Sequence, residues 1–285
     1  MFNRLHHQRI SGILNKINTD LFSESGCYFA GGTAIALLLG EYRESVDIDF
    51  LCSKESFKQM RELAGNGIQA YFKEPVVLLR EPRIDRYGIR FLLDLKDGLK
   101  PIKFEVIHEG YLPELRAHKH DLCGVKTLHQ EDLMACKIMS TSDRGLDKAT
   151  KSRDIIDLLM LSHSYGGISE RVISKVETNY GTFSSGLVQA KKMLENVEHR
   201  NLCFKDLDVS EQAQYLVKSL VEKKDQDVLP SLRSGAFEVN TKTEDGSTFS
   251  LMPESGNGSP LDIQGIKTDL STKEILSYLR ESRKG

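Results

Sequence analysis

The chain has 285 residues and a mass of 32.1 kDa, and 39% of its residues are hydrophobic, enough for one large folded domain or two ordinary ones. Its 39 Lys and Arg residues nearly balance 41 Asp and Glu residues, and this formal net charge of −2 excludes a protein that binds nucleic acid through an overall excess of positive charge. The longest hydrophobic run has six residues, 34–39, far below the roughly 20 that span a bilayer, so we expect neither a membrane segment nor a signal peptide.

The first half of the chain predicts alternating helices and strands. Hydrophobic residues at helical spacing predict an amphipathic helix over about residues 4–20. The run 27–30 predicts a strand, which Gly31-Gly32 separates from strong helix formers at 33–39. Apolar and polar residues alternate over 46–51, as in a strand, and 54–63 predicts a helix.

Three further β-rich runs follow, at 76–80, 87–95 and 102–107. The pair Asp97-Gly98 between the last two is typical of a hairpin turn, so these two strands should be antiparallel neighbours. From residue 130 the pattern is helical, at about 130–141, 152–163, 168–178, 184–197 and 208–222. We therefore predict an α/β (α+β) fold with a mixed sheet, followed by a mainly helical C-terminal half.

The last part of the chain has a different composition. Residues 224–267 are rich in Gly, Pro and Ser, which favours a flexible linker over a packed layer. Ser271-Thr272-Lys273-Glu274 is a capping-box pattern that predicts a short terminal helix. The predicted organisation is 1–125 as an α/β domain, 126–223 as a helical domain, and 224–285 as linker plus terminal helix.

Two aspartates inside an apolar strand are the strongest chemical signal. Alternate strand residues point to one face, so Asp47 and Asp49 should lie together, and two adjacent buried carboxylates call for a cation between them. Oxygen ligands favour Mg²⁺ or Mn²⁺, and paired ions of this kind promote displacement at phosphorus. Glu105, on a predicted neighbouring strand, is the candidate third ligand. The alternative is an exposed edge strand on which Glu105 only pairs with a nearby cation.

The glycine turn favours the first interpretation. Gly31-Gly32-Thr33 stands between a predicted strand and a predicted helix, where free N–H groups and the Thr33 hydroxyl can bind phosphate oxygens. By itself a Gly-Gly pair usually marks an ordinary turn. The spacing of neither a P-loop nor a dinucleotide-binding fingerprint is present.

These residues together resemble a known family. The order of a glycine turn, a helix, an aspartate pair and a later acid is similar to the DNA polymerase β-like nucleotidyltransferase superfamily. Gly-Gly-Thr-Ala followed by Arg-x-Ser-x-Asp-Ile-Asp resembles more narrowly the AbiEii/MenT-type toxins of type IV toxin–antitoxin and phage-defence systems. A second block supports the narrower resemblance, because those toxins have a D-x-x-x-x-K helix and then a [K/R]-D-x-x-D-L helix, and this chain has Asp132 to Lys137 and then Arg153 to Leu158.

The resemblance implies a role for each matching position. Asp47, Asp49 and Glu105 would hold Mg²⁺ or Mn²⁺, although Asp94 or Glu109 would replace Glu105 if the strand register differs. Lys137 would bind phosphate charge, and Asp154 would activate the acceptor hydroxyl or shape the site. The residues implied to bind the nucleotide are Gly31, Gly32, Thr33, Arg43, Ser45 and Lys137.

The implied activity is transfer of a nucleoside monophosphate from an NTP to an acceptor hydroxyl. The expected acceptor is the 3′ end of tRNA, and its modification would block translation. Residues 1–125 would be the nucleotidyltransferase domain, and 126–223 would complete its active-site cleft. NTP, tRNA and a cognate antitoxin would be the partners of a cytoplasmic protein with no membrane association. The five cysteines never form C-x-x-C, in agreement with reduced thiols.

Other interpretations stay open at this stage. The acceptor could be a protein or a small molecule such as an aminoglycoside, or the chain could be an inactive nucleotide-binding or interaction module. Lys137 could be a snorkelling side chain at the rim of a helix, and Arg153 and Asp154 could be ordinary surface charges. A positive loop, Arg144 to Arg153, could steer RNA or could simply be a solvated loop of mixed charge.

Overall fold

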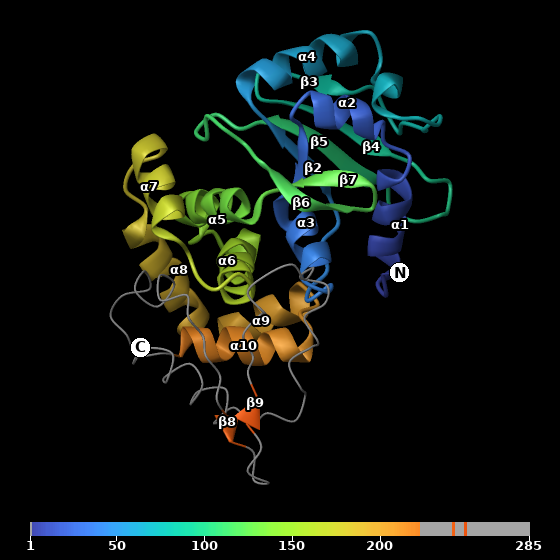
Figure 1. The fold of residues 1–285 in the computed structure, drawn as a ribbon. Helices are drawn as coiled ribbons and strands as arrows, with labels where there is room; N and C mark the ends of the chain where they lie inside the picture. Colours follow the sequence, from blue (N-terminus) through green and yellow to red (C-terminus); the bar gives the residue numbers. More distant parts are fainter. Residues whose placement is uncertain (1, 223–240, 243–247, 250–285) are drawn as a thin grey trace. The chain divides into compact units, whose positions relative to one another are not determined.

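The computed structural model describes residues 2–222, 241–242 and 248–249 (Figure 1). The chain divides into two compact units, Met1–Leu133 and Met134–Gly285, and the division falls within helix α5 (Gln130–Arg144). The predicted boundary at 125/126 remains a prediction. The predicted terminal helix and nearly all of the predicted linker lie outside the described residues.

The first unit contains the predicted mixed sheet. Its seven strands follow the order β3-β4-β5-β2-β1-β7-β6. β4 and β5 are antiparallel neighbours, which confirms the hairpin predicted from Asp97-Gly98, whereas β2 and β5 are parallel. The strands are β1 (Tyr28–Ala30), β2 (Ile48–Cys52), β3 (Arg83–Ile84), β4 (Gly88–Leu93), β5 (Ile102–His108), β6 (Ala117–Leu122) and β7 (Val125–Leu128).

The helices of the first unit differ from prediction at the N-terminus. The single helix predicted over 4–20 is wrong, because α1 (Leu5–Leu14) ends early and α2 (Thr19–Glu24) begins separately. Between them Ile17 pairs with Phe72 in an isolated β-bridge, and the Asn18 side chain caps α2. α3 (Gly31–Leu38) and α4 (Lys54–Gly65) agree with prediction within a few residues, and a 3₁₀-helix, Ile68–Tyr71, follows α4.

One strand prediction is wrong, and three strands, β3, β6 and β7, were not predicted. Residues 76–80 form no strand and contribute only a bridge between Leu78 and Leu93, while Val77 and Leu79 remain about half exposed. The β6–β7 hairpin was not predicted, because β6 is mostly polar. Its turn, Cys123-Gly124, has positive φ at both residues, which is the backbone requirement of a tight hairpin turn.

The core of the first unit lies on one face of the sheet. Phe50 of β2, Phe104 of β5 and Phe91 of β4 stack side by side, with ring centroids 5.5 and 4.7 Å apart, and Phe22 of α2 packs on Phe50 at 4.5 Å. Burial of these aromatic rings fixes the orientation of the strands. Because side chains alternate across a strand, the residues next to these phenylalanines point to the other face.

The second unit is helical, as predicted. Between residues 130 and 222 the structure has one more α-helix than the sequence predicts, because Asn196 ends α8 and caps α9, where the prediction has one helix over 184–197. Besides the C-terminal part of α5, the helices are α6 (Arg153–Ser164), α7 (Glu170–Asn179), α8 (Ser184–Glu195), α9 (Val197–Asp206) and α10 (Glu211–Val221), and two short strands, β8 (Thr241–Lys242) and β9 (Thr248–Phe249), pair antiparallel.

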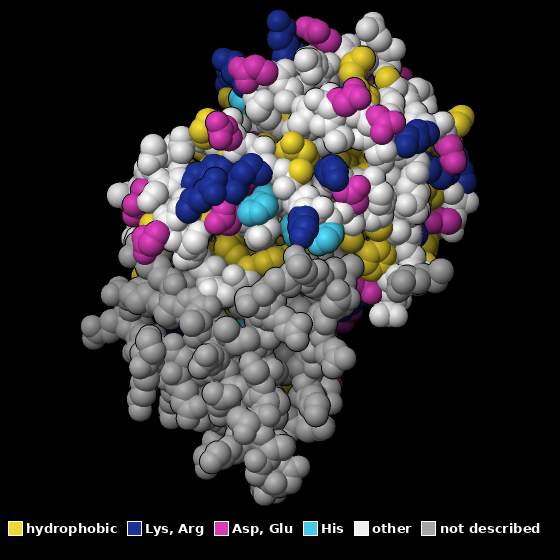
Figure 2. All heavy atoms as spheres, in the orientation of Figure 1, with side chains coloured by type: hydrophobic (Ala, Val, Ile, Leu, Met, Phe, Trp, Pro, Cys, Tyr) yellow, Lys and Arg dark blue, Asp and Glu magenta, His cyan; other side chains and the backbone are white. Residues whose placement is uncertain are grey.

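The described surface fits the near-zero net charge. Figure 2 shows acidic and basic side chains interspersed over the face drawn, with one denser group of Lys and Arg. Within the described residues, no helix combines the length and hydrophobicity required to cross a membrane.

Candidate active site

The turn between β1 and α3 brings the backbone against the aspartate strand. Gly31 has a φ of +73°, and Ala30 just before it pairs with Asp49 of β2. A Cβ atom on Gly31 would lie 3.0 Å from Cβ and Cγ of Asp49 and would overlap its Oδ2. Glycine is therefore required here both for the backbone conformation and for the close approach of the Asp49 carboxylate.

The other residues predicted to bind nucleotide gather beside this turn. A Cβ atom on Gly32 would overlap the guanidinium of Arg43, which is only 2% exposed, and would lie 3.4 Å from Oγ of Ser45. Thr33 Oγ1 donates a hydrogen bond to Ser45 Oγ at 2.8 Å. The first turn of α3 supplies backbone N–H groups with no intrahelical acceptor, so the combination can bind an anion.

The strand register places two of the predicted acids together. Asp49 of β2 is directly opposite Glu105 of the parallel strand β5, so both side chains leave the same face of the sheet. This face is opposite the phenylalanine core. Asp47 precedes Asp49 by two residues, immediately before β2 begins. The alternatives Asp94 and Glu109 lie just beyond the ends of β4 and β5.

Glu105 is held by cations in the structure. Arg90 Nε donates to Glu105 Oε1 at 2.8 Å, and Lys103 forms an ion pair with Oε2. Arg90 also bonds Asp85 at 3.0 Å. Arg90 was not among the residues predicted from the sequence. The signal that could have identified it is its position on the strand that pairs with β5, where Arg90 and Glu105 are register partners.

These contacts decide how well the acids fit a metal ion. Within the described part of the chain, no three His, Cys, Asp or Glu side chains are grouped so that they could hold one. The donor set of Asp47, Asp49 and Glu105 is all oxygen, which suits Mg²⁺ or Mn²⁺. Binding by all three would require Glu105 to exchange Arg90 and Lys103 for the metal ion.

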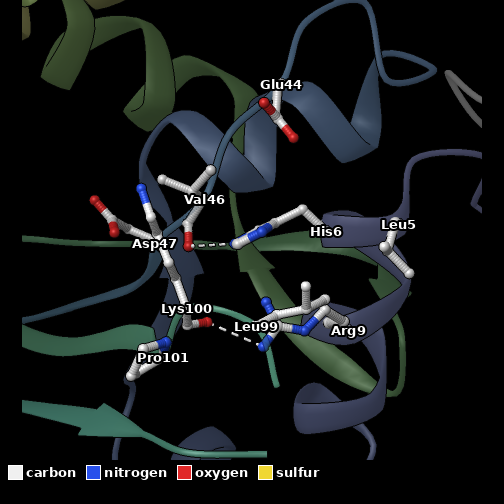
Figure 3. A pocket seen from close by; sticks show the side chains of 9 residues that line it. All are labelled: Leu5, His6, Arg9, Glu44, Val46, Asp47, Leu99, Lys100 and Pro101. Atoms are coloured by element: carbon white, nitrogen blue, oxygen red, sulfur yellow. Dashed lines mark hydrogen bonds between the residues drawn. The ribbon is translucent and has the colours of Figure 1, made fainter. Parts of the chain in front are cut away.

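A pocket adjoins Asp47 on the first unit. Its volume is about 530 Å³, and Figure 3 shows it between α1, the segment before β2 and the β4–β5 turn. Arg9 Nη2 donates to the backbone oxygen of Lys100 at 3.0 Å, which connects the turn to α1. Exposed apolar side chains alternate with charged ones around it, and the lining residues are Leu5, His6, Arg9, Glu44, Val46, Asp47, Leu99, Lys100 and Pro101.

The second unit contains a buried ionic network. Lys137 Nζ of α5 lies 2.8 Å from Asp154 Oδ1 and 2.7 Å from Asp157 Oδ2, both on α6. Their side chains are at most 7% exposed. Lys137 therefore does not lie at a solvated rim, and Asp154 is not a surface charge. Arg144, at the C-terminal end of α5, bonds Asp154 at 2.8 Å from the more exposed side.

The network fixes the charge of Asp154. Burial raises the pKa of this carboxyl, but the charges and hydrogen bonds of Lys137 and Arg144 outweigh burial and hold the pKa of Asp154 well below its usual value. Asp154 is therefore an ionised carboxylate and a weak base. Lys151 pairs with Asp206 at 3.1 Å, so Arg144 and Lys151, two cations of the positive loop, are paired with acids of the same unit.

Comparison with protein families gives a match over most of the chain. A family model described as nucleotidyl transferase AbiEii toxin, type IV TA system, matches residues 13–234. No curated protein matches the chain in sequence. Among solved structures, a candidate nucleotidyltransferase from Helicobacter pylori has a TM-score of 0.48 and 18% identity, covering 77% of this chain and 95% of its own. JHP933 from Helicobacter pylori has a TM-score of 0.47 and 16% identity, covering 79% and 94%.

Proposed function

Because this chain belongs to the AbiEii family of nucleotidyl transferase toxins from type IV toxin–antitoxin systems, we propose that it transfers a nucleoside monophosphate from an NTP to the 3′ end of tRNA. Membership makes the protein a nucleotidyltransferase with an antitoxin as partner. The tRNA acceptor, the metal ion and the roles of individual residues are parts of the proposal.

The observation that carries the proposal is the register of Asp49 and Glu105 beside the glycine turn. Mg²⁺ or Mn²⁺ held by Asp47, Asp49 and Glu105 would neutralise the charge that develops on the phosphates. Gly31, Gly32 and Thr33 bind the triphosphate through backbone N–H groups and a hydroxyl. The buried guanidinium of Arg43 and the Ser45 hydroxyl, which both lie beside the turn, border it.

The transfer step exchanges one phosphorus–oxygen bond for another. The acceptor oxygen bonds to the α-phosphorus, the bond to the β-phosphate oxygen breaks, and pyrophosphate leaves. The acceptor proton passes to solvent or to a base. With its lowered pKa, Asp154 is a poor base, so its role in this proposal is to hold Lys137 as an ammonium for phosphate binding. That residues 126–223 complete the active-site cleft remains a prediction.

The pocket beside Asp47 is our candidate for the terminal nucleotide of the acceptor. Asp47, one of the residues that would hold the metal ion, lines this pocket, so an acceptor bound here would lie beside the proposed site. Leu5, Val46 and Leu99 are 46–61% exposed and offer apolar walls to a base, and Lys100 supplies charge for a phosphate. Its volume is within the usual range for small-molecule sites.

A labelling assay tests the proposal. Purified protein is incubated with Mg²⁺, total tRNA and each of the four α-labelled NTPs in turn, and we expect labelled tRNA with at least one NTP. Removal of the metal with EDTA should abolish labelling. Asp49→Asn should lower the rate by roughly 10²–10³-fold because a metal ligand is lost. Asp94→Asn is the matched control, because the carboxylate of Asp94 is a nearby acid that bonds Lys96 in its own turn.

The other candidates give different results in the same assay. A mass increase on a protein or an aminoglycoside, with unlabelled tRNA, would move the acceptor to one of those classes. NTP binding without turnover would indicate an inactive nucleotide-binding module. Folded wild-type protein that labels tRNA with none of the four NTPs refutes the proposed acceptor.

A further inference from the structure

The N-terminus of α1 is capped from outside the helix. Arg4 precedes α1 and provides no side-chain cap. Instead, the Glu41 carboxylate accepts hydrogen bonds from the backbone N–H groups of Asn3 at 2.6 Å and Arg4 at 3.0 Å. Glu41 lies in the connection between α3 and β2, so this carboxylate joins α1 to the segment that leads to the aspartates.

His7 extends the same connection into the interior. Its side chain is fully buried, and Nδ1 lies 2.9 Å from Glu41 Oε1. The backbone N–H of Ser45 donates to His7 Nε2 at 3.2 Å. Because a backbone N–H only donates and a carboxylate only accepts, Nδ1 carries the proton and Nε2 is the acceptor.

His6 holds the next residue of the same segment. Its Nε2 donates to the backbone oxygen of Val46 at 3.1 Å, as Figure 3 shows. Since a carbonyl only accepts, His6 carries its proton on Nε2, whereas His7 carries its proton on Nδ1. The two neighbouring histidines therefore bind the N–H of Ser45 and the C=O of Val46, the two residues immediately before Asp47. We call His6, His7 and Glu41 the histidine clamp.

The clamp is not needed to dock α1. Ile10, Ile13 and Leu14 are at most 1% exposed, and their burial already attaches the helix to the unit. What the histidines add is a fixed position for the backbone of Ser45 and Val46. The Ser45 side chain accepts the hydrogen bond from Thr33, so the clamp, the glycine turn and the aspartate segment form one connected set.

We propose that His6 and His7 are positioning residues that set the place of Asp47 through the backbone of Ser45 and Val46. The inference rests on the proposed function, in which Asp47 binds the metal ion. Both histidines precede residue 13, where the family match begins, so the match assigns them no role. Misplacement of a reacting group by about 1 Å can cost roughly 100-fold in rate, which is why such a clamp would matter.

Two substitutions of His7 separate positioning from simple packing. His7→Gln can place an amide oxygen near the position of Nε2 and accept from Ser45 N–H, whereas His7→Asn can place its amide near Nδ1 and bond Glu41 but cannot reach Ser45. Each variant keeps one of the two buried hydrogen bonds. A purely structural role therefore predicts similar losses of thermal stability and similar behaviour for both.

The first measurement is hydrogen–deuterium exchange of residues 44–50 in the full-length protein. We expect His7→Asn to speed exchange of this segment by roughly tenfold or more, because local opening becomes easier, and His7→Gln to remain close to wild type. The second is Mg²⁺-dependent transfer with labelled NTP and total tRNA. There His7→Asn should lower kcat by roughly 10- to 100-fold with little change in KM for NTP, and His7→Gln should restore most of it.

The outcomes distinguish this inference from the proposed function. Equal exchange in the two variants, or activity losses that follow thermal stability and not exchange, overturn the clamp. If wild-type protein transfers nothing to tRNA but His7→Asn alone speeds exchange at 44–50, the clamp on this segment stands and the proposed acceptor fails. His6→Ala gives an independent check by exchange alone, because it removes the bond to Val46 and leaves the bonds of His7 to Glu41 and Ser45 in place, and it should also speed exchange of 44–50.

Discussion

At the scale of single residues, Gly31 makes the sharpest prediction. Ala at this position meets two obstacles, a left-handed backbone that costs roughly 1–2 kcal/mol for a residue with a Cβ, and overlap with the Asp49 carboxylate. Gly124, in the β6–β7 turn, has a similar φ of +75°, but a Cβ atom there would meet no other atom within 4 Å. Gly31→Ala should therefore lose most transfer activity, whereas Gly124→Ala should lose only stability.

Urea unfolding and the labelling assay measured side by side test this difference. Both variants should unfold at lower urea concentration than wild type, because both force Ala into the same backbone region. If Gly124→Ala loses as much activity as Gly31→Ala, backbone strain alone explains the effect, and the contact between Gly31 and Asp49 has no role in catalysis.

The ionic network predicts a pH dependence of stability. The pKa of Asp154 is lower in the folded protein than in the unfolded chain, where it is about 3.9. The unfolded state therefore binds the proton more readily, so the stabilisation from ionised Asp154 is complete above about pH 4 and is lost as pH falls through the folded value. The difference in unfolding free energy between wild type and Asp154→Asn should be largest at neutral pH and should shrink below about pH 4.

Urea titrations between about pH 7 and pH 2.5 measure this difference. Asp206→Asn is the matched control in the same unit, because Asp206 is one-third exposed and pairs with Lys151 at the surface, and its removal should cost under about 1 kcal/mol at each pH. A wild-type advantage over Asp154→Asn that stays constant across this range would contradict the assigned charge state.

At the scale of elements, the β4–β5 turn matters because it forms one wall of the pocket beside Asp47. Lys100 lines this pocket, whereas Lys96 of the same turn bonds Asp94 and does not line it. Lys100→Gln should raise KM for tRNA by up to roughly tenfold and reduce its salt dependence, with KM for NTP unchanged. Lys96→Gln should leave both constants near wild type.

Steady-state kinetics of both variants at several salt concentrations measure KM for tRNA and KM for NTP. If Lys100→Gln raises KM for NTP and leaves KM for tRNA unaffected, the pocket binds the nucleotide donor and the acceptor approaches elsewhere. Equal effects of the two glutamine substitutions would indicate a general loss of positive charge and no specific pocket contact.

The strands show which secondary-structure elements the local sequence can predict and which it cannot. The β4–β5 hairpin was predictable because Asp97-Gly98 marks a turn and both strands alternate, but its connection is longer than a two-residue turn, since the last register pair is Leu93 with Ile102. The polar strand β6 was not, because its place in the sheet depends on pairing with β7 and not on its own hydrophobicity. Residues 76–80 have the composition of a strand, but only Leu78 finds a bridge partner.

The candidate site also has features that the local sequence predicts and features that it does not. The glycine turn and Asp47 to Asp49 were visible because strand, turn and helix follow each other directly in sequence. That Asp49 lies opposite Glu105 depends on which strands are neighbours, a long-range property that alternation does not encode. Arg90 and the histidine clamp were missed for the same reason, since Arg90 faces Glu105 and His7 faces Ser45 only after folding.

At the scale of the whole molecule, the family match spans both compact units. It begins within α1 and continues past α10, so it includes the acids of the first unit and the Lys137 network of the second. The matched region is thus larger than the sheet alone. The residues after 234 lie outside the match, and they include the predicted terminal helix with Ile275, Leu276 and Leu279.

Because the family match ends at residue 234, truncation there should affect nucleotide transfer and neutralisation by the antitoxin differently. A chain ending at residue 234 retains the whole matched region, so it should label tRNA as the full-length protein does. If the C-terminal segment binds the antitoxin, the truncated toxin should escape neutralisation in cells that co-express both proteins. The full-length double variant Ile275→Asp/Leu279→Asp should also escape neutralisation, because charge on the apolar face of the predicted helix opposes its docking on the antitoxin. Truncated protein that is as toxic and as fully neutralised as the complete chain would exclude this segment from antitoxin binding.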